Sequence, residues 1–208
     1  PDVLSAISQL GYDADKVIVL IHQFVTILKD GSPMKMSTRK ANFVTLDELI
    51  DEVGSDVVRY FFIMRGMNTH LNFDLDLAKD ESDENPVFYL QYAHARVSNI
   101  IKKSIELNIN QNNEADLSLL KADAENNLIN KMNSFPECVK RAHDNKEPQT
   151  IAIYLHNLAM YFHKFYATHK VITDDIDLTA SRLLLVKAVQ IVLRNGLRIL
   201  GISAPDKM

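Results

Sequence analysis

The sequence is poor in cysteine, and the single Cys138 excludes both an internal disulfide and a zinc site built from a cysteine cluster. One free cysteine is typical of proteins in a reducing compartment, so we expect the protein to be cytoplasmic. No segment approaches the roughly 18 consecutive apolar residues of a membrane span, and no signal peptide precedes the first helix. We therefore expect no membrane partner. Because the first residue is Pro1 and not methionine, we also expect the chain to be part of a longer protein.

An excess of basic residues is also lacking. The chain has 23 lysines and arginines against 27 aspartates and glutamates, which gives a formal net charge of −4. Proteins that hold nucleic-acid phosphates usually present a basic face. The overall balance therefore weighs against nucleic acid. If RNA binds, the basic residues must be concentrated locally while the acidic residues lie elsewhere.

The start of the chain predicts a small α/β unit. An apolar stripe predicts a helix over Asp2–Leu10, and the β-branched run Val17–Leu28 predicts a long buried strand. Asp30-Gly31 is a hairpin turn signal, with Ser32–Met36 as the short return strand. One strand and a hairpin are too few to complete a doubly wound sheet, so we expect the remaining strands to lie upstream of this chain.

Two short helices and a linker are predicted next. Thr45 and Glu48 have capping-box spacing, which predicts a helix that runs to about Val53, and a second helix is expected over Ser55–Arg65. The acidic stretch Gly66–Glu84 has no clear periodicity and is expected to be irregular. We place the domain boundary there, with one domain over residues 1–80 and another over residues 81–208.

The second domain is predicted to be entirely helical. Asn85-Pro86 supplies a cap and a first-turn proline for its first long helix. The predicted helices are Pro86–Leu107, Ala122–Ser134, Pro136–His143, a long helix that begins at Glu147-Pro148, and Leu178–Asn195. The fold class is thus mostly α, with a small α/β remnant followed by an all-α bundle.

The loop KMSTRK, Lys35–Lys40, concentrates cationic and hydroxyl-bearing side chains between the hairpin and the first capped helix. Several cations on a mobile loop suit a polyphosphate, because they can close over it and stabilise negative charge at the reacting phosphorus. The loop has no glycine-rich cradle, however. From these residues alone, a solvated basic surface loop is the better explanation.

A second pattern follows Asn85-Pro86. Tyr89 and Ala93 are four residues apart and share a helix face, where an exposed ring beside a small residue would form a platform with a notch for an unpaired base. Arg96, Asn99 and Lys103 continue as a polar and cationic stripe that suits a phosphate backbone. Ordinary amphipathic packing, with a tyrosine in the core and the charges in water, explains the same pattern and is favoured by these residues alone.

No metal site is predicted. His156 and His163 could share a helix face, but no third ligand stands at metal spacing, so packing beside Phe162 and Tyr166 is the better explanation. The acidic run Asp74–Glu84 lacks the glycine pattern of a calcium loop and is interpreted as a solvated linker.

Longer matches resemble a known family. The sequence KMSTRKANFVTLDELIDEVGSDVVRYFF is similar to the signature-loop region of class I aminoacyl-tRNA synthetases, which carry a Lys-Met-Ser-Lys-Ser motif. The segments QFVTILKDGSPMKMS, FDLDLAKDESDENPVFYLQYAHAR and NGLRILGISAPDKM resemble arginyl-tRNA synthetases. The resemblance covers nearly the whole chain. It implies the end of a Rossmann-like catalytic domain, followed by a helical anticodon-binding domain.

The resemblance also implies a reaction: adenylation of arginine by Mg-ATP, then transfer of the arginyl group to the terminal ribose of arginine tRNA. Thr38 stands where the motif has its second lysine, so Arg39 or Lys40 would supply the missing charge, and which of them does so stays open. The implied ATP-binding residues are Lys35, Met36, Ser37, Thr38, Arg39 and Lys40, of which Lys35, Ser37, Arg39 and Lys40 would be catalytic.

In this family the positions that match Tyr89, Ala93 and the terminal Met208 are implicated in anticodon-loop binding. The predicted tRNA site is therefore Tyr89, Ala93, Arg96, Asn99, Lys103 and Met208. The other class I signature, a His-x-Gly-His-like sequence, is not in the chain, and the arginine pocket would lie mostly upstream. We expect this fragment to be unable to activate arginine alone, and the full-length enzyme to be a monomer.

Two alternatives stay open. The chain could be a non-catalytic helical module that binds RNA or protein, with an incidental basic loop. The sequence that precedes Pro1 would decide between such a module and a synthetase. Another class I synthetase with the same anticodon-domain type, such as the cysteine enzyme, is disfavoured because zinc-type cysteines are lacking.

Overall fold

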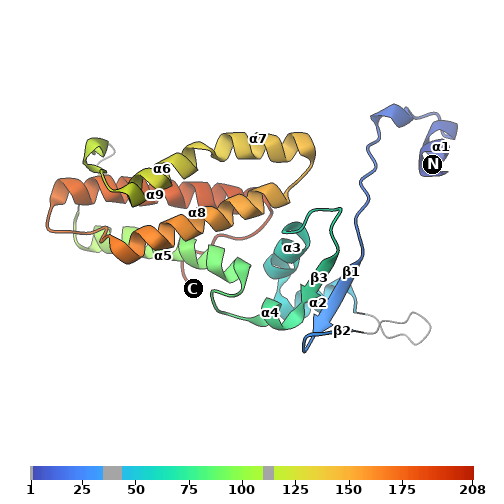
Figure 1. The fold of residues 1–208 in the computed structure, drawn as a ribbon, viewed down its shortest axis with the longest axis horizontal. Coiled ribbons are helices and arrows are strands. Elements are labelled where there is room, and N and C mark those ends of the chain that lie inside the picture. The colour runs from blue at the N-terminus through green and yellow to red at the C-terminus, as the bar shows by residue number, and fades with distance from the viewer. Residues whose placement is uncertain (1, 35–43, 110–114) are drawn as a thin grey trace.

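The computed structural model describes residues 2–34, 44–109 and 115–208. A small sheet with short helices lies at one end of the molecule, and long packed helices form the other end (Figure 1). The fold class predicted from the sequence, mostly α with a small α/β part, is therefore confirmed.

The sheet has three strands in the order β2-β1-β3. Strand β1 (Val25–Lys29) pairs antiparallel with β2 (Ser32–Pro33) and parallel with β3 (Leu71–Asp74). Asp30 and Gly31 both have positive φ angles, 51° and 69°, which is the type I′ geometry of a two-residue hairpin. The predicted hairpin is confirmed, although its return strand is shorter than expected within the described residues.

The long buried strand predicted over residues 17–28 is wrong for most of that range. Residues 17–24 are extended but not in a strand, and Ile21 and Phe24 are 77% and 82% exposed. An apolar run becomes a buried strand only where other elements pair with it and cover it. Among the described residues, no strand or helix does so here. Helix α1 (Asp2–Gln9) forms as predicted, followed by the short η1 (Ala14–Lys16), but no residue of either is buried.

The capped helices are confirmed. In α2 (Leu46–Val53), the Thr45 hydroxyl accepts from Glu48 N and the Glu48 carboxylate accepts from Thr45 N, which completes the capping box. Helix α3 (Ser55–Ile63) follows directly after Gly54.

The segment over residues 66–84 is more regular than predicted, because it contains β3 and helix α4 (Leu75–Lys79). Leu71 and Phe73 alternate inward with exposures of 2% and 0%, a strand pattern that the surrounding acidic residues conceal. Asp74 caps α4 by accepting from Asp76 N and Leu77 N. The interpretation of residues 74–84 as a solvated linker is therefore wrong at its start.

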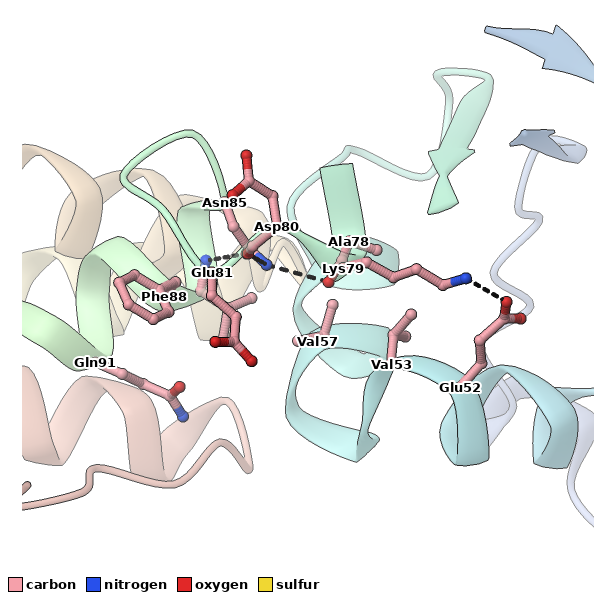
Figure 2. Close-up of a pocket in the computed structure, with 11 residues that line it drawn as sticks. Glu52, Val53, Val57, Ala78, Lys79, Asp80, Glu81, Asn85, Phe88 and Gln91 are labelled. Carbon is pink, nitrogen blue, oxygen red and sulfur yellow. Dashed lines mark hydrogen bonds and ion pairs between the residues drawn. The ribbon is translucent and has the colours of Figure 1, made fainter. Parts of the chain in front are cut away.

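The α4–α5 junction is fixed by a buried side chain. Asn85, 3% exposed, donates to the carbonyl oxygens of Ala78 and Asp80 at 3.2 and 2.9 Å and accepts from Val87 N (Figure 2). A cavity of about 230 Å³ lies beside it, where Lys79 forms an ion pair with Glu52 at 2.6 Å. The chain therefore passes from the sheet to the bundle in a defined direction.

The predicted helices of the bundle are all present. They are α5 (Pro86–Glu106), α6 (Asp123–Asn133), α7 (Phe135–Asn145), α8 (Gln149–Thr168) and α9 (Ile176–Ile199), with the short η3 (Leu117–Leu119) before α6.

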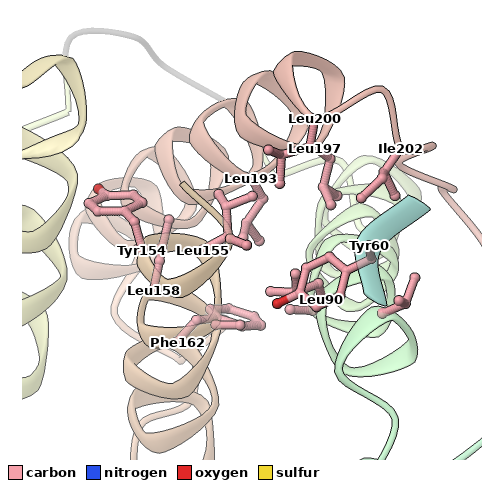
Figure 3. Close-up of a cluster of buried hydrophobic side chains, with 14 of the residues drawn as sticks. Tyr60, Leu90, Tyr154, Leu155, Leu158, Phe162, Leu193, Leu197, Leu200 and Ile202 are labelled. Atoms are coloured by element: carbon pink, nitrogen blue, oxygen red, sulfur yellow. The ribbon is translucent and has the colours of Figure 1, made fainter. Parts of the chain in front are cut away.

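One hydrophobic core joins the bundle to α3. Leu90, Leu155, Phe162 and Leu193 are fully buried, and Tyr60 of α3 lies in the same cluster (Figure 3). Helices α8 and α9 cross closely at Gly196. A Cβ atom there would lie 2.4 Å from Leu155 Cδ2, so only glycine fits without displacement.

Candidate nucleic-acid interface

The predicted ATP loop lies outside the described residues. Lys35, Met36, Ser37, Thr38, Arg39 and Lys40 all fall between residue 34 and residue 44. The structure places only the flanks of this loop, β2 on one side and the Thr45 cap of α2 on the other.

The first part of α5 does not form the expected platform with a notch. Ala93 is 0% exposed, so its methyl group faces the core and no notch opens beside Tyr89. Tyr89 is half-buried, and its ring packs against His156 and His163 with centroid distances of 5.1 and 4.8 Å. Burial, and next the charge of Asp83, raise the pKa of the Tyr89 hydroxyl. Tyr89 therefore offers part of its surface, while Ala93 offers none.

His163 packs beside Phe162 as predicted, with centroids 5.5 Å apart, whereas His156 is exposed. Burial, and next the charge of Arg96, lower the pKa of His163, so its ring is neutral near pH 7. No group of three or more potential metal ligands occurs among the described residues.

Arg96 is held between two tyrosine rings. Its guanidinium carbon lies 4.4 Å from the Tyr92 centroid and 5.1 Å from the Tyr166 centroid, and Nη2 donates to the Tyr92 hydroxyl. Nη1 lies 3.5 Å from His163 Nδ1. These contacts fix the plane of the guanidinium on the surface of the bundle. The sequence prediction included Arg96 but not the two tyrosines, although Tyr92 stands four residues earlier on the same helix face.

The stripe on α5 continues into a groove. A cavity of about 240 Å³ is lined by Tyr92, Arg96, Asn99, Ile100, Lys103 and Tyr166. A second cavity of about 520 Å³ is lined by Ile100, Lys103, Leu107, Tyr166, His169, Lys170, Val171 and Ile172. Because the cavities share Ile100, Lys103 and Tyr166, they form one continuous feature, which we call the α5–α8 groove. The structure thus brings together the predicted residues Arg96, Asn99 and Lys103.

The charge in this groove has one sign. Arg96, Lys103 and Lys170 are cationic, and none of the described residues that line the two cavities is acidic. The net charge of −4 therefore conceals a local concentration of basic side chains. Tyr166 and His169 add aromatic rings beside the cations. Cations combined with accessible rings suit single-stranded nucleic acid, whose bases stack while its phosphates pair with basic groups.

Comparison with known proteins agrees with this geometry. Residues 90–208 match the model of the DALR anticodon binding domain. The chain belongs to the DALR anticodon-binding family. Curated relatives extend the similarity to the whole chain: it is 49% identical to an arginine–tRNA ligase of Salinibacter ruber over 100% of this chain and 37% of the relative. A Desulfotalea psychrophila arginine–tRNA ligase is 48% identical, over 100% and 38%.

Solved structures show the same fold. A Campylobacter jejuni structure described as an arginyl-tRNA synthetase superposes with a TM-score of 0.85 at 32% identity, over 99% of this chain and 44% of that one. The Thermus thermophilus arginyl-tRNA synthetase gives 0.79 at 26% identity, over 99% and 38%. The resemblance to arginyl-tRNA synthetases is therefore confirmed. The chain spans little more than a third of the length of the curated relatives it matches.

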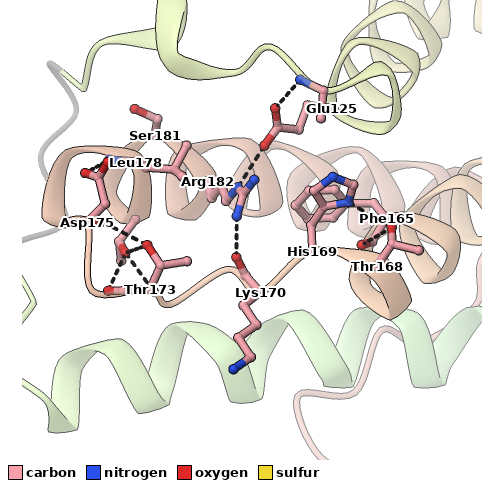
Figure 4. A network of polar contacts seen from close by, with 12 residues as sticks. Glu125, Phe165, Thr168, His169, Lys170, Thr173, Asp175, Leu178, Ser181 and Arg182 are labelled. Atoms are coloured by element: carbon pink, nitrogen blue, oxygen red, sulfur yellow. Dashed lines mark hydrogen bonds and ion pairs between the residues drawn. The ribbon is translucent and has the colours of Figure 1, made fainter.

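In the DALR domain, the segment after α8 that forms one side of the groove is held in place by hydrogen bonds from α9. Arg182 of α9 donates to the Lys170 carbonyl oxygen at 2.7 Å and to the Glu125 carboxylate at 2.7 Å (Figure 4). Glu125 is 1% exposed and also accepts from Ala122 N. This buried, hydrogen-bonded ion pair holds the segment after α8 in place. Sequence reasoning missed His169 and Lys170, because they come near Lys103 only through the packing of α8 on α5.

The C-terminal residues of the DALR domain lie along α5. His94, fully buried, donates from Nδ1 to the Pro205 carbonyl at 2.8 Å, and Ser98 donates to Asp206 Oδ1 at 2.8 Å. Met208 is 49% exposed and does not line the groove. Terminal residues usually fray, but this tail is held to within two residues of its last position.

None of the described helices combines the length and the apolar character that a membrane crossing requires.

Proposed function

We propose that this chain is the tRNA-binding C-terminal part of an arginine–tRNA ligase, and that the α5–α8 groove receives unpaired nucleotides of arginine tRNA. The observation that carries the proposal is the lining of the groove, where three cations and several aromatic rings occur and no acidic side chain is found among the residues that the structure describes. The names of the relatives, all arginine–tRNA ligases, support the choice of tRNA.

The groove offers different groups to the phosphates and to the bases. Lys103 and Lys170 are exposed ammonium groups that pair with phosphates and release counterions. Tyr166 and His169 provide rings for base stacking. Arg96, already stacked between tyrosines, presents fixed N–H donors to a phosphate or a base edge. Tyr89 and Met208 would extend the contact outside the groove, whereas Ala93 is fully buried and would act only through the packing of the core.

In the full-length enzyme the reaction would be the Mg-ATP-dependent adenylation of arginine, followed by transfer of the arginyl group to tRNA. Lys35, Ser37 and either Arg39 or Lys40 would neutralise the ATP phosphates as negative charge develops. Magnesium would be carried in with ATP. We also propose that the enzyme is cytoplasmic and monomeric.

The test replaces both exposed lysines, Lys103→Ala and Lys170→Ala, and measures binding of labelled arginine tRNA by fluorescence anisotropy at several salt concentrations. Losing two phosphate contacts should weaken binding and make the negative slope of log affinity against log salt shallower by about 2. Lys140→Ala, an exposed lysine on α7 that does not line the groove, is the matched control and should change neither quantity appreciably. Unchanged affinity and slope in the double variant would overturn the proposal.

A further inference from the structure

The segment after α9, Leu200–Asp206, crosses between two parts of the fold, and we call it the C-terminal strap. Its first residues are buried, with Leu200 and Ile202 exposed by only 2% and 4%. Gly201 has a φ angle of +70°, and a Cβ atom there would lie 2.5 Å from Arg59 Nε. The turn that starts the strap therefore needs glycine, both for its backbone conformation and for the close approach of α3.

The first half of the strap is bound to α3. Arg59 donates from Nε to the Leu200 carbonyl oxygen. Asp56 accepts from Ser203 N at 3.2 Å and from the Ser203 hydroxyl through the same oxygen, Oδ2. That oxygen also accepts from Gln91 Nε2 of α5 at 2.9 Å. One carboxylate thus joins three segments that are far apart in sequence: α3, α5 and the strap.

The second half of the strap is bound to the bundle. His94 donates to the Pro205 carbonyl oxygen and Ser98 donates to Asp206, as described above. Asp206 Oδ1 also lies 3.7 Å from Arg194 Nη2. Gln190 of α9 donates to the Ser98 hydroxyl at 2.6 Å. Burial lowers the pKa of His94, so its ring is neutral near pH 7, and its Nδ1–H serves the carbonyl of Pro205. The strap therefore has one set of anchors on each side of the α3–bundle junction.

We propose that the C-terminal strap couples RNA binding on the bundle to α3, and that Asp56 is the positioning residue at its centre. The inference rests on the proposed function, because RNA that contacts α5 and Met208 would further restrict the motion of the anchored strap, which ends two residues before Met208. A hydrogen bond to a carboxylate is stronger than one between neutral groups, so restricting the motion of Ser203 also restricts Asp56 in the first turn of α3. Such coupling is reciprocal: whatever stabilises α3 also favours the RNA-bound tail.

Amide hydrogen exchange with and without arginine tRNA tests this coupling in the chain itself. In the wild type, bound tRNA should slow exchange in the strap and in α3, by about tenfold in α3. Asp56→Ala should keep the slowing in α5 and the strap and lose it in α3. Ser203→Ala removes the hydrogen bonds of the Ser203 hydroxyl with Asp56 and Gln91 but keeps the Asp56 carboxylate and the bond from Ser203 N. It should show a partial loss of the slowing in α3 even if Asp56→Ala folds poorly.

Asp123→Ala is the control, because Asp123 is also an acid in the first turn of a helix, α6, but it is exposed and lies outside the strap network. It should behave as the wild type. If tRNA binds and protects the strap while exchange in α3 stays unchanged, or if protection of α3 survives in Asp56→Ala, the coupling is overturned. Absence of any tRNA binding by the wild type would instead overturn the proposed function, and this inference with it.

Discussion

Tyr89 and Ala93 show how neighbouring residues on one helix can differ in what they offer a ligand. The family resemblance implied that both contact RNA, whereas the residues alone favoured ordinary packing with a tyrosine in the core. Ala93 is fully buried, and Tyr89 lies half-buried against two histidine rings. Helical spacing gives the directions of side chains relative to one another around the helix axis. It does not say which of these directions faces the core when several faces of the helix carry apolar residues. On α5 the face that contains Ala93 is covered by neighbouring helices, which the sequence of α5 alone does not reveal.

At this scale the first prediction concerns Tyr89. If a base stacks on its accessible part, Tyr89→Ala should weaken tRNA binding by roughly 1–3 kcal/mol. Tyr89→Phe, which keeps the ring, should retain most of the affinity. Since no phosphate contact is lost, the salt dependence of binding should stay as in the wild type. Isothermal titration at two salt concentrations measures both quantities, and unchanged affinity in a folded Tyr89→Ala variant would assign Tyr89 a purely structural role.

Among the elements, those with strong local signals were predicted well. The Thr45 capping box, the Asp30-Gly31 turn and the Asn85-Pro86 helix start each specify their own geometry, and each is confirmed. Elements that depend on partners were predicted poorly. Residues 17–24 have the pattern of a buried strand, but no element in the described part of the chain covers them. Strand β3 was missed because acidic neighbours mask the alternation of its apolar residues.

The α8–α9 crossing gives a prediction about an element pair. Gly196→Ala places a methyl group 2.4 Å from Leu155 Cδ2 in a fully packed core, so it should destabilise the fold by about 1–3 kcal/mol. Urea denaturation measures the change. Gly66→Ala is the control, because the nearest atom to its added carbon is 3.4 Å away and belongs to the flexible side chain of Gln149. Equal stability of the two variants would mean that the crossing tolerates a wider separation than the structure shows.

At the scale of the whole molecule, the overall composition was a misleading guide to RNA binding, because the local arrangement of the charged side chains determines it. A net charge of −4 argued against RNA, whereas folding collects Arg96, Lys103 and Lys170 around a groove whose described lining holds no acidic residue. The sequence supplied half of that groove, the α5 stripe, because those residues repeat along one helix. The other half, on the segment after α8, depends on long-range packing and on the buried Arg182–Glu125 pair. No local pattern encodes it.

The central claim is that this groove binds arginine tRNA chiefly through its phosphates, and the salt dependence of binding tests it most directly. Filter binding of the wild-type chain to arginine tRNA and to an unrelated tRNA, between about 50 and 200 mM salt, gives affinity, preference and slope together. We expect tighter binding to arginine tRNA and a steep fall in affinity with salt, with a slope of roughly −2 to −3 if the three groove cations each pair with one phosphate. Equal binding to both tRNAs with a slope near zero would contradict the account.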